Sequence, residues 1–308
     1  MLHSRRALLQ GMVLAAVGKR AGQKREATMS AEGTDTLKYC LNTGTIRGQA
    51  LGAMGELEVA ARAGYDAIEP WVRDLKRMES EGTPVETYKK RLEDAGMTME
   101  SAIAFPRWIV DDEEERAKGL EEVKRVMDIV ARAGGKRVAC PPSGATEGAV
   151  LDLLDVAERY RAVLKLGEEM DVVPQVEVWG FSINLHRLGQ AVCVAVESGH
   201  PKACILADVY HLYRGGSSFE GLSLLTGTSC PVLHMNDYPA EPERENLTDA
   251  DRVLPGDGVA PMGDILSAWR DTETHQVLSL ELFNRTYWER DALDVAKEGL
   301  EKMKSCAG

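Results

Sequence analysis

Short apolar runs alternate along the chain with longer stretches in which apolar residues recur every three or four positions. The short runs are typical of buried parallel strands, and the longer stretches are typical of amphipathic helices. Strands are predicted over residues 37–42, 66–70, 98–105, 136–141, 174–179, 203–208, 231–237 and 276–283. Helices are predicted over residues 49–63, 84–95, 113–133, 147–170, 187–198, 217–226, 262–270 and 288–304.

Strict alternation of strands and helices predicts a parallel sheet covered by helices, and a count of eight favours closure into a barrel. The expected fold class is therefore α/β, a single-domain (β/α)8 TIM barrel over residues 36–308. One barrel uses about 250 residues, which the 308 residues of the chain can supply. A doubly wound open sheet is the alternative, but no G-x-G-x-x-G motif follows the first strand.

Residues 1–35 precede the barrel and resemble an export signal with a linker. Adjacent arginines are followed by a modest apolar stretch from Ala7 to Val17 and by further basic residues. This pattern is similar to a twin-arginine signal and predicts a periplasmic or otherwise exported protein. The apolar stretch is too short for a membrane span. The alternatives are a basic leader on a cytoplasmic protein, or a true start at Met29.

Charge divides the chain at about the same place. The formal net charge is −12, and residues 1–28 contain six basic side chains and one acidic one, so the remainder carries −17. Such an acidic body repels a phosphate backbone, and nucleic acid is not expected as a partner. A small-molecule substrate is compatible with it, because a bound cation reverses the local field. Homo-oligomer formation is left open.

Four consecutive predicted strands each end in a side chain that can bind a metal ion: Glu177, Asp208, His234 and Glu281. The carboxyl ends of the strands form the catalytic face of a (β/α)8 barrel. One such residue alone is more often a helix cap, an ion pair or a core histidine. Four in phase, flanked by Val, Leu and Ile, are costly to bury without a cation. One divalent ion is therefore expected, with Mn²⁺ preferred and Mg²⁺, Co²⁺ or Zn²⁺ as alternatives.

The order Glu…Asp-x-x-His…His…Glu resembles the xylose isomerase-like barrel superfamily. It is most similar to the ketose 3-epimerases, hydroxypyruvate isomerases and inosose dehydratases of that superfamily. The similarity covers nearly all of the chain after the leader, and its most specific parts are residues 208–211, 234–237, 252–258 and Glu281. The endonucleases of the same superfamily hold three zinc ions with extra histidines on the second to fourth strands, which this chain lacks.

The resemblance implies roles for four residues. Glu177 and Glu281 would bind the metal and also act as acid and base on opposite faces of the substrate. His211 and Arg252 would contact substrate oxygens as part of the catalytic machinery. The stretch between His234 and Arg252 is longer than in the epimerases, so Arg244 is an alternative for the arginine.

Further candidates for substrate binding follow other strand ends. Trp71, Trp108 and Trp179 are aromatic residues at the expected rim, where a sugar can stack on a ring face. Glu69 ends the second strand and is expected to reach the pocket. The alternatives are that the aromatic residues simply cover the barrel mouth and that Glu69 forms an ion pair.

Together these observations predict a divalent-metal-dependent isomerase or epimerase of a sugar or sugar derivative. A base would remove a proton next to a carbonyl, a metal-stabilised enediolate would form, and the proton would return on the opposite face or the neighbouring carbon. A lyase or dehydratase that loses a β-hydroxyl, or a hydrolase of a keto-glycoside, is the alternative. A non-catalytic sugar-binding barrel is a third interpretation.

Overall fold

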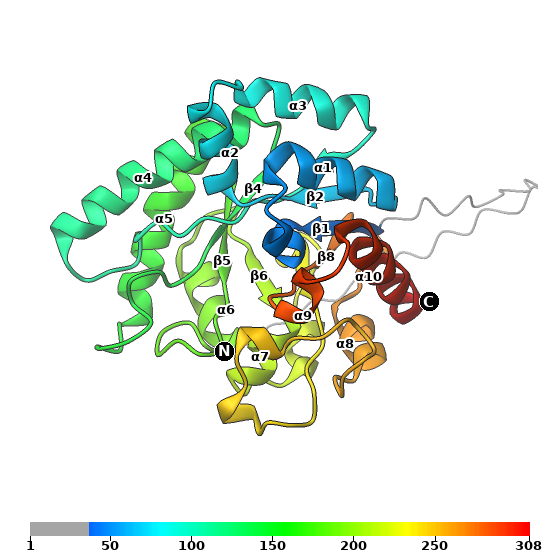
Figure 1. The fold of residues 1–308 in the computed structure, drawn as a ribbon. Helices are drawn as coiled ribbons and strands as arrows, with labels where there is room; N and C mark the ends of the chain where they lie inside the picture. Colours follow the sequence, from blue (N-terminus) through cyan, green and yellow to red (C-terminus); the bar gives the residue numbers. More distant parts are fainter. Residues whose placement is uncertain (1–36) are drawn as a thin grey trace, which may run out of the picture. The chain divides into compact units, whose positions relative to one another are not determined.

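Eight parallel strands form the centre of the structure, a computed structural model that describes residues 37–308 (Figure 1). The leader predicted over residues 1–35 lies outside the described residues. The strands are β1 (Leu37–Asn42), β2 (Ala67–Glu69), β3 (Thr98–Met99), β4 (Arg137–Cys140), β5 (Val173–Glu177), β6 (Ile205–Asp208), β7 (Val232–Met235) and β8 (Gln276–Leu280).

The sheet closes on itself, as the alternating pattern predicts. Strands pair in the order β3-β2-β1-β8-β7-β6-β5-β4, and every pairing is parallel. Between the two ends of this order, Met99 forms a parallel bridge with Gly135, and the Ala139 N–H donates to the Ala102 carbonyl at 2.9 Å. The predicted (β/α)8 barrel is confirmed.

Helices surround the barrel (Figure 1). The α-helices are α1 (Gly52–Ala63), α2 (Val72–Ser80), α3 (Val85–Asp94), α4 (Glu113–Arg132), α5 (Leu153–Met170), α6 (Leu188–Glu197), α7 (Val209–Arg214), α8 (Met262–Trp269), α9 (Arg285–Trp288) and α10 (Ala292–Ala307). The 3₁₀ turns are η1 (Thr43–Gln49), η2 (Phe219–Leu224), η3 (Arg244–Asn246) and η4 (Asp249–Asp251). Within residues 37–308, no helix combines the length and apolar character needed to cross a lipid bilayer.

The pattern of apolar residues did not predict α2, α7 and α9. Each is short, and α2 presents a narrow buried face, with Val72, Leu75 and Met78, in a mostly charged segment. The predicted strand over 98–105 is regular only at its first two residues, because the chain then continues as an extended segment that bridges to Trp71 through Ile103.

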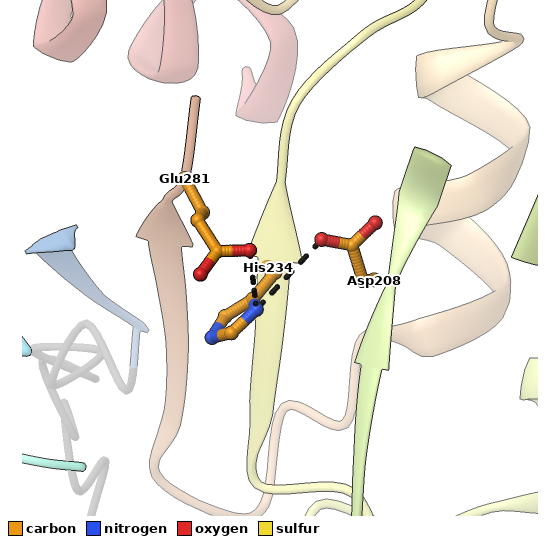
Figure 2. A group of neighbouring side chains, drawn as sticks. All are labelled: Asp208, His234 and Glu281. Atoms are coloured by element: carbon orange, nitrogen blue, oxygen red, sulfur yellow. Dashed lines mark ion pairs between the residues drawn. The ribbon is translucent and has the colours of Figure 1, made fainter. Parts of the chain in front are cut away.

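The barrel interior is apolar at its base and polar at the carboxyl ends of the strands. Alternate strand residues share one face, and a small inner cluster contains Cys40, Ala67, Leu206, Val232 and Val277. Two positions further along, the same faces carry Asn42, Glu69, Asp208, His234 and Ser279. Figure 2 shows Asp208, His234 and Glu281 extending from three neighbouring strands toward one another. The period of the strands therefore gathers polar side chains at one end of the barrel.

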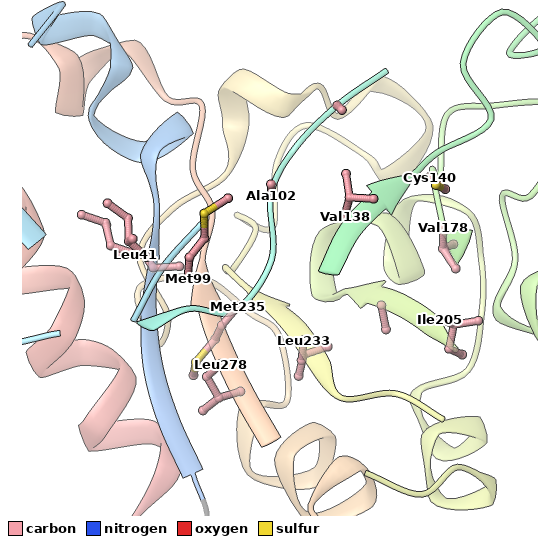
Figure 3. Packing of buried hydrophobic residues seen from close by; sticks show 14 of the residues in the cluster. Leu41, Met99, Ala102, Val138, Cys140, Val178, Ile205, Leu233, Met235 and Leu278 are labelled. Carbon is pink, nitrogen blue, oxygen red and sulfur yellow. The ribbon is translucent and has the colours of Figure 1, made fainter. Parts of the chain in front are cut away.

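The other strand face packs in the main hydrophobic core (Figure 3). Leu41, Ile205, Leu233 and Leu278 are buried members of this core, and each alternates with a member of the inner cluster. Burying such side chains contributes about 1.5–3 kcal/mol each. The packed core therefore holds the strands in place and gives the site a rigid frame.

The long segment between β7 and α8 is held by one carboxylate. Asp237 Oδ1 accepts from the N–H groups of Tyr238 at 2.8 Å and Ala260 at 2.9 Å, and Oδ2 accepts from Gly256 at 3.0 Å and Gly258 at 3.1 Å. A Cβ at Gly258 would lie 2.2 Å from the Tyr238 carbonyl oxygen, so only glycine fits there. The anchored residues follow Arg252 by a few positions, so the Asp237 carboxylate also helps to position Arg252.

Glu56 of α1 is a buried carboxyl group outside this polar end. Glu56 is only 3% exposed. Burial, and next the negative charge of Asp74, raise the pKa of Glu56 to about 7. The folded chain therefore favours the neutral form, whereas the unfolded chain ionises at the ordinary value of about 4.3.

We expect Glu56→Gln to stabilise the protein only above about pH 5, because the amide never ionises. The wild-type free energy of unfolding should fall as pH rises from about 4.5 to 7, since the folded state binds the extra proton in that window. Above pH 7 the variant should be more stable by about 3–4 kcal/mol. Urea denaturation at pH 5 and pH 8 measures the difference. Glu58→Gln, on the same helix but half exposed, is the control for replacing a glutamate of α1 by an amide outside the core. A Glu56→Gln advantage equal at both pH values would contradict the argument.

Candidate active site

Asp208, His234 and Glu281 form a compact buried group at the carboxyl ends of β6, β7 and β8 (Figure 2). One potential ligand atom from each lies within 4.8 Å of the others. The Nδ1 atom of His234 is 3.1 Å from Glu281 Oε2 and 3.7 Å from Asp208 Oδ2. The structure therefore brings three of the four predicted metal ligands together.

The donors in this group suit a divalent cation. His234 Nδ1 is buried and has no hydrogen-bond partner within residues 37–308, although it faces two carboxylates. An unpaired imidazole nitrogen beside carboxylate oxygens is the donor set of Mn²⁺, Co²⁺ or Zn²⁺ sites. The three residues thus make a possible metal site.

Glu177, the fourth predicted ligand, ends the neighbouring strand β5 and lines the cavity beside the group. Its Oε2 atom is buried and unpaired within the described part of the chain. Burial, together with the charges of Glu281 and Asp208, raises the pKa of Glu177 to about 8. Without a cation this carboxyl group is therefore mostly protonated at neutral pH.

Glu69 orients His234 rather than lining the cavity. Glu69 was predicted to bind substrate; the structure places it fully buried behind His234, and it is not among the residues that line the cavity. Its Oε2 atom accepts from Asn42 Nδ2 at 2.9 Å and Ser279 Oγ at 2.7 Å, and lies 2.9 Å from His234 Nε2. A proton on Nε2 leaves the Nδ1 lone pair for a metal, as in carboxylate–histidine–metal arrangements. Burial opposes a charge on the ring, but Glu281 and Glu69 raise the pKa of His234 well above its ordinary value.

Arg252 is the buried guanidinium of the site. Its Nη1 atom donates to Asp208 Oδ2 at 3.0 Å and Glu281 Oε2 at 2.9 Å, and Nη2 donates to Asp249 Oδ1 at 2.5 Å. Arg244, the alternative weighed from the sequence, is exposed and pairs with its neighbour Glu245. Of the two arginines, Arg252 therefore reaches the predicted metal ligands.

The contact with Arg252 fixes the tautomer of His211. Arg252 Nη2 lies 3.0 Å from His211 Nε2, and because a guanidinium can only donate, Nε2 must accept. The proton therefore sits on Nδ1, which has no partner within residues 37–308. Burial, in spite of the nearby carboxylate of Asp208, lowers the pKa of His211 to about 3 and keeps the ring neutral. His211 thus offers one N–H beside the cavity.

A cavity of about 330 Å³ lies above these groups. Its ionisable lining includes Glu177, His211, Arg252 and Glu281, and its aromatic lining includes Trp71, Phe105, Trp179, Phe181, Phe283 and Trp288. The rings of Trp71 and Phe105 are 5.1 Å apart, and those of Phe105 and Trp179 are 5.8 Å apart. A continuous aromatic wall therefore faces the polar floor.

Trp108 takes no part in this wall, which corrects the sequence prediction. It is fully buried, donates from Nε1 to the Pro141 carbonyl at 2.8 Å, and packs against Tyr160. Its position after a strand suggested the rim, but the extended segment after β3 turns the side chain into the core. Trp71 and Trp179 do line the cavity, as expected.

Several contacting residues were missed in the sequence. Asn42 ends β1, and its Nδ2 atom donates to Glu69 Oε2 at 2.9 Å and Glu281 Oε1 at 3.0 Å. Its position at a strand end was a signal that could have identified it. Asn236 donates to Asp208 Oδ2 at 2.9 Å, and Asp249 lies in a loop whose sequence has no periodic signal.

Comparisons with known proteins agree with this fold. The profile of the family described as xylose isomerase-like TIM barrel matches residues 57–306. Inosose isomerase of Bacillus velezensis is 25% identical over 290 residues, which cover 87% of this chain and 98% of that protein. The crystal structure of the IolI protein, which contains a zinc atom, superposes with a TM-score of 0.80 at 21% identity and covers 88% of this chain and 98% of its own. L-ribulose 3-epimerase superposes with a TM-score of 0.72 at 14% identity and covers 88% of this chain and 94% of its own.

We expect Glu69→Gln to weaken Mn²⁺ binding about 10–100-fold, the usual effect of losing the partner that orients a metal-binding histidine. Calorimetric titration of metal-free protein measures the affinity, and circular dichroism checks the fold. Ser279→Ala is the matched control, since it removes one hydrogen bond to the same oxygen and keeps the carboxylate. Its effect should be smaller. Unchanged Mn²⁺ affinity in Glu69→Gln would show that this contact does not prepare His234 for a metal.

Metal binding should strengthen as pH rises and should release protons. In the metal-free protein the pKa of Glu177 is about 8 and that of His234 is raised, so both carry protons at pH 7 that a cation must displace. About one to two protons should leave per ion at pH 7. Titrations in buffers of different ionisation enthalpy measure the number, and Glu177→Gln should release about one fewer. Binding without proton release would exclude both residues as protonated ligands.

Proposed function

We propose, on the premise that this chain belongs to the xylose isomerase-like TIM barrel family, that it is a divalent-metal-dependent isomerase or epimerase of a sugar or sugar derivative. The observation that carries the proposal is the buried group of Asp208, His234 and Glu281 beneath an aromatic-walled cavity. Glu177 completes the proposed ligand set, and Mn²⁺ is the proposed ion. The similarity to inosose isomerase supports the reaction class.

A divalent ion held by Asp208, His234, Glu281 and Glu177 would supply Lewis acidity to the substrate. The protein itself supplies two carboxyl groups with opposite tendencies. Burial favours the neutral form of Glu281, but His234 and Arg252 outweigh it and lower its pKa, whereas the pKa of Glu177 is raised to about 8. In the metal-free protein the two carboxyl groups therefore differ in charge. We assign the removal and the return of the substrate proton to this pair, one on each face of the substrate.

Two hydrogen-bond donors complete the proposed arrangement. His211 offers its Nδ1–H. The four Nη–H groups of Arg252 already donate to other side chains, so its Nε–H, which has no partner among the described residues, is the donor left for a substrate oxygen. The rings of Trp71 and Trp179 can pack against the C–H face of a sugar. The substrate carbon that loses its proton is thereby held between Glu177 and Glu281 and screened from water.

We expect Glu281→Gln and Glu177→Gln to reduce turnover about 10²–10⁴-fold, because an amide cannot exchange the substrate proton. His211→Ala should have a smaller effect, since it removes a donor and no acid or base. The measurement is deuterium incorporation from D₂O into a panel of ketoses and inososes, followed by NMR with metal content verified. Arg244→Gln, which replaces an exposed arginine away from the carboxylates, is the control and should leave the rate unchanged.

The outcomes separate the reaction classes. Deuterium incorporation without loss of water supports isomerisation or epimerisation, whereas release of water or of an aglycone identifies a lyase or hydrolase. Full exchange in metal-loaded Glu281→Gln would remove Glu281 as the base. No exchange and no product with any member of the panel would count against the proposed function.

A further inference from the structure

Arg47 is a half-buried cation in η1 that lines the cavity without an anionic partner. Its guanidinium carbon lies 5.0 Å from the ring centroid of Trp71, 5.1 Å from that of Phe283 and 4.8 Å from that of Trp288. None of the ion pairs and hydrogen bonds within residues 37–308 involves this guanidinium. Three aromatic rings therefore hold it in place while its N–H groups remain unused.

This lack of a partner sets Arg47 apart from nearby arginines. Arg252 pairs with two buried carboxylates. Arg73 also stacks on the Trp71 ring, but its Nε atom lies 3.6 Å from a carboxylate oxygen of Asp74. Aromatic faces attract a cation, but they leave in-plane donors unsatisfied, and such donors are costly to desolvate. Burial and the positive charge of Arg73 lower the pKa of Arg47 and outweigh the charges of Glu281, Asp249 and Asp74, none of which contacts the guanidinium.

A second guanidinium lies at the same cavity. Arg285, at the start of α9, is exposed, lines the cavity and also has no hydrogen-bond or ion-pair partner among the described residues. Its helix packs on η1, where Gln49 Nε2 donates to the Tyr287 carbonyl at 2.9 Å. Two guanidinium groups that contact no carboxylate among the described residues thus face one cavity from adjoining elements, in a lining that also contains Glu177, Asp249 and Glu281.

We propose that Arg47, assisted by Arg285, binds an anionic group of the substrate, so that the enzyme acts on a sugar acid or a sugar phosphate. This inference rests on the proposed function and adds the substrate class. A planar guanidinium matches the paired oxygens of a carboxylate or phosphate. The guanidinium carbons of Arg47 and Arg252 lie 5.1 Å and 5.0 Å from the Phe283 ring centroid, and both residues line the same cavity. The reacting end lies beside Arg252, and the anionic end lies beside Arg47.

The test uses three polyols of similar size that do not react: D-glucitol, D-gluconate and D-glucitol 6-phosphate. Binding to the full-length, Mn²⁺-loaded protein is followed by calorimetry at low ionic strength, where charge pairing is least screened. At least one anionic probe should bind about 10-fold or more tightly than D-glucitol. The two anionic probes distinguish a carboxylate from a phosphate as the preferred group.

Variants assign the effect to Arg47. Arg47→Gln should remove the preference for the anion, and Arg47→Lys should keep part of it. Arg73→Gln is the matched control, because it removes a nearby arginine stacked on the same tryptophan, and it should keep the full preference. Equal binding of D-glucitol and both anions, equal losses in the Arg47→Gln and Arg73→Gln proteins, or no binding of any probe would overturn the inference. An intact, Arg47-dependent preference without deuterium exchange in the ketose panel would overturn the proposed reaction instead.

Discussion

The burial of four carboxyl groups at one end of the barrel is the constraint on which the site depends. Glu69, Glu177, Asp208 and Glu281 are each less than 5% exposed. Removing such groups from water costs several kcal/mol each unless charges or hydrogen bonds compensate. Arg252 and a protonated His234 supply part of the compensation, and protonation of Glu177 supplies more. The remaining negative charge is what a divalent cation would neutralise, so electrostatics supports the proposed metal ion.

The site divides into a rigid part and an adjustable part. The carboxylates and His234 project from strands whose other face is packed in the core, and this packing holds them in place. The residues that would contact the rest of the substrate, such as Arg47, Phe181 and Arg285, lie on turns and short helices after the strands. In barrels of this type the chemistry is held by the strand ends and specificity is set by the loops.

Much of this arrangement could be predicted from the sequence, because a strand has a period of two and a barrel has one catalytic end. The four ligand candidates were identified in this way, and the structure places three of them in one group. The role of Glu69 could not be predicted, since period alone does not tell whether a carboxylate meets a substrate or a histidine. Trp108 was misplaced because the direction of a side chain after a strand end depends on tertiary packing. Arg47 gave no signal, because the sequence alone does not show which arginine at the cavity lacks a carboxylate partner.

Asp237 has a consequence for how this enzyme can change over evolution. Its carboxylate fastens residues 256–260 to the end of β7, and the backbone of the same residue pairs with Val253. The Asp237 side chain does not anchor the residues between Tyr238 and Arg252 in this way. Insertions and deletions there can accumulate while the guanidinium stays at the carboxylates. The barrel can therefore acquire a new outer surface beside its cavity, and with it new substrates, without rebuilding the catalytic floor.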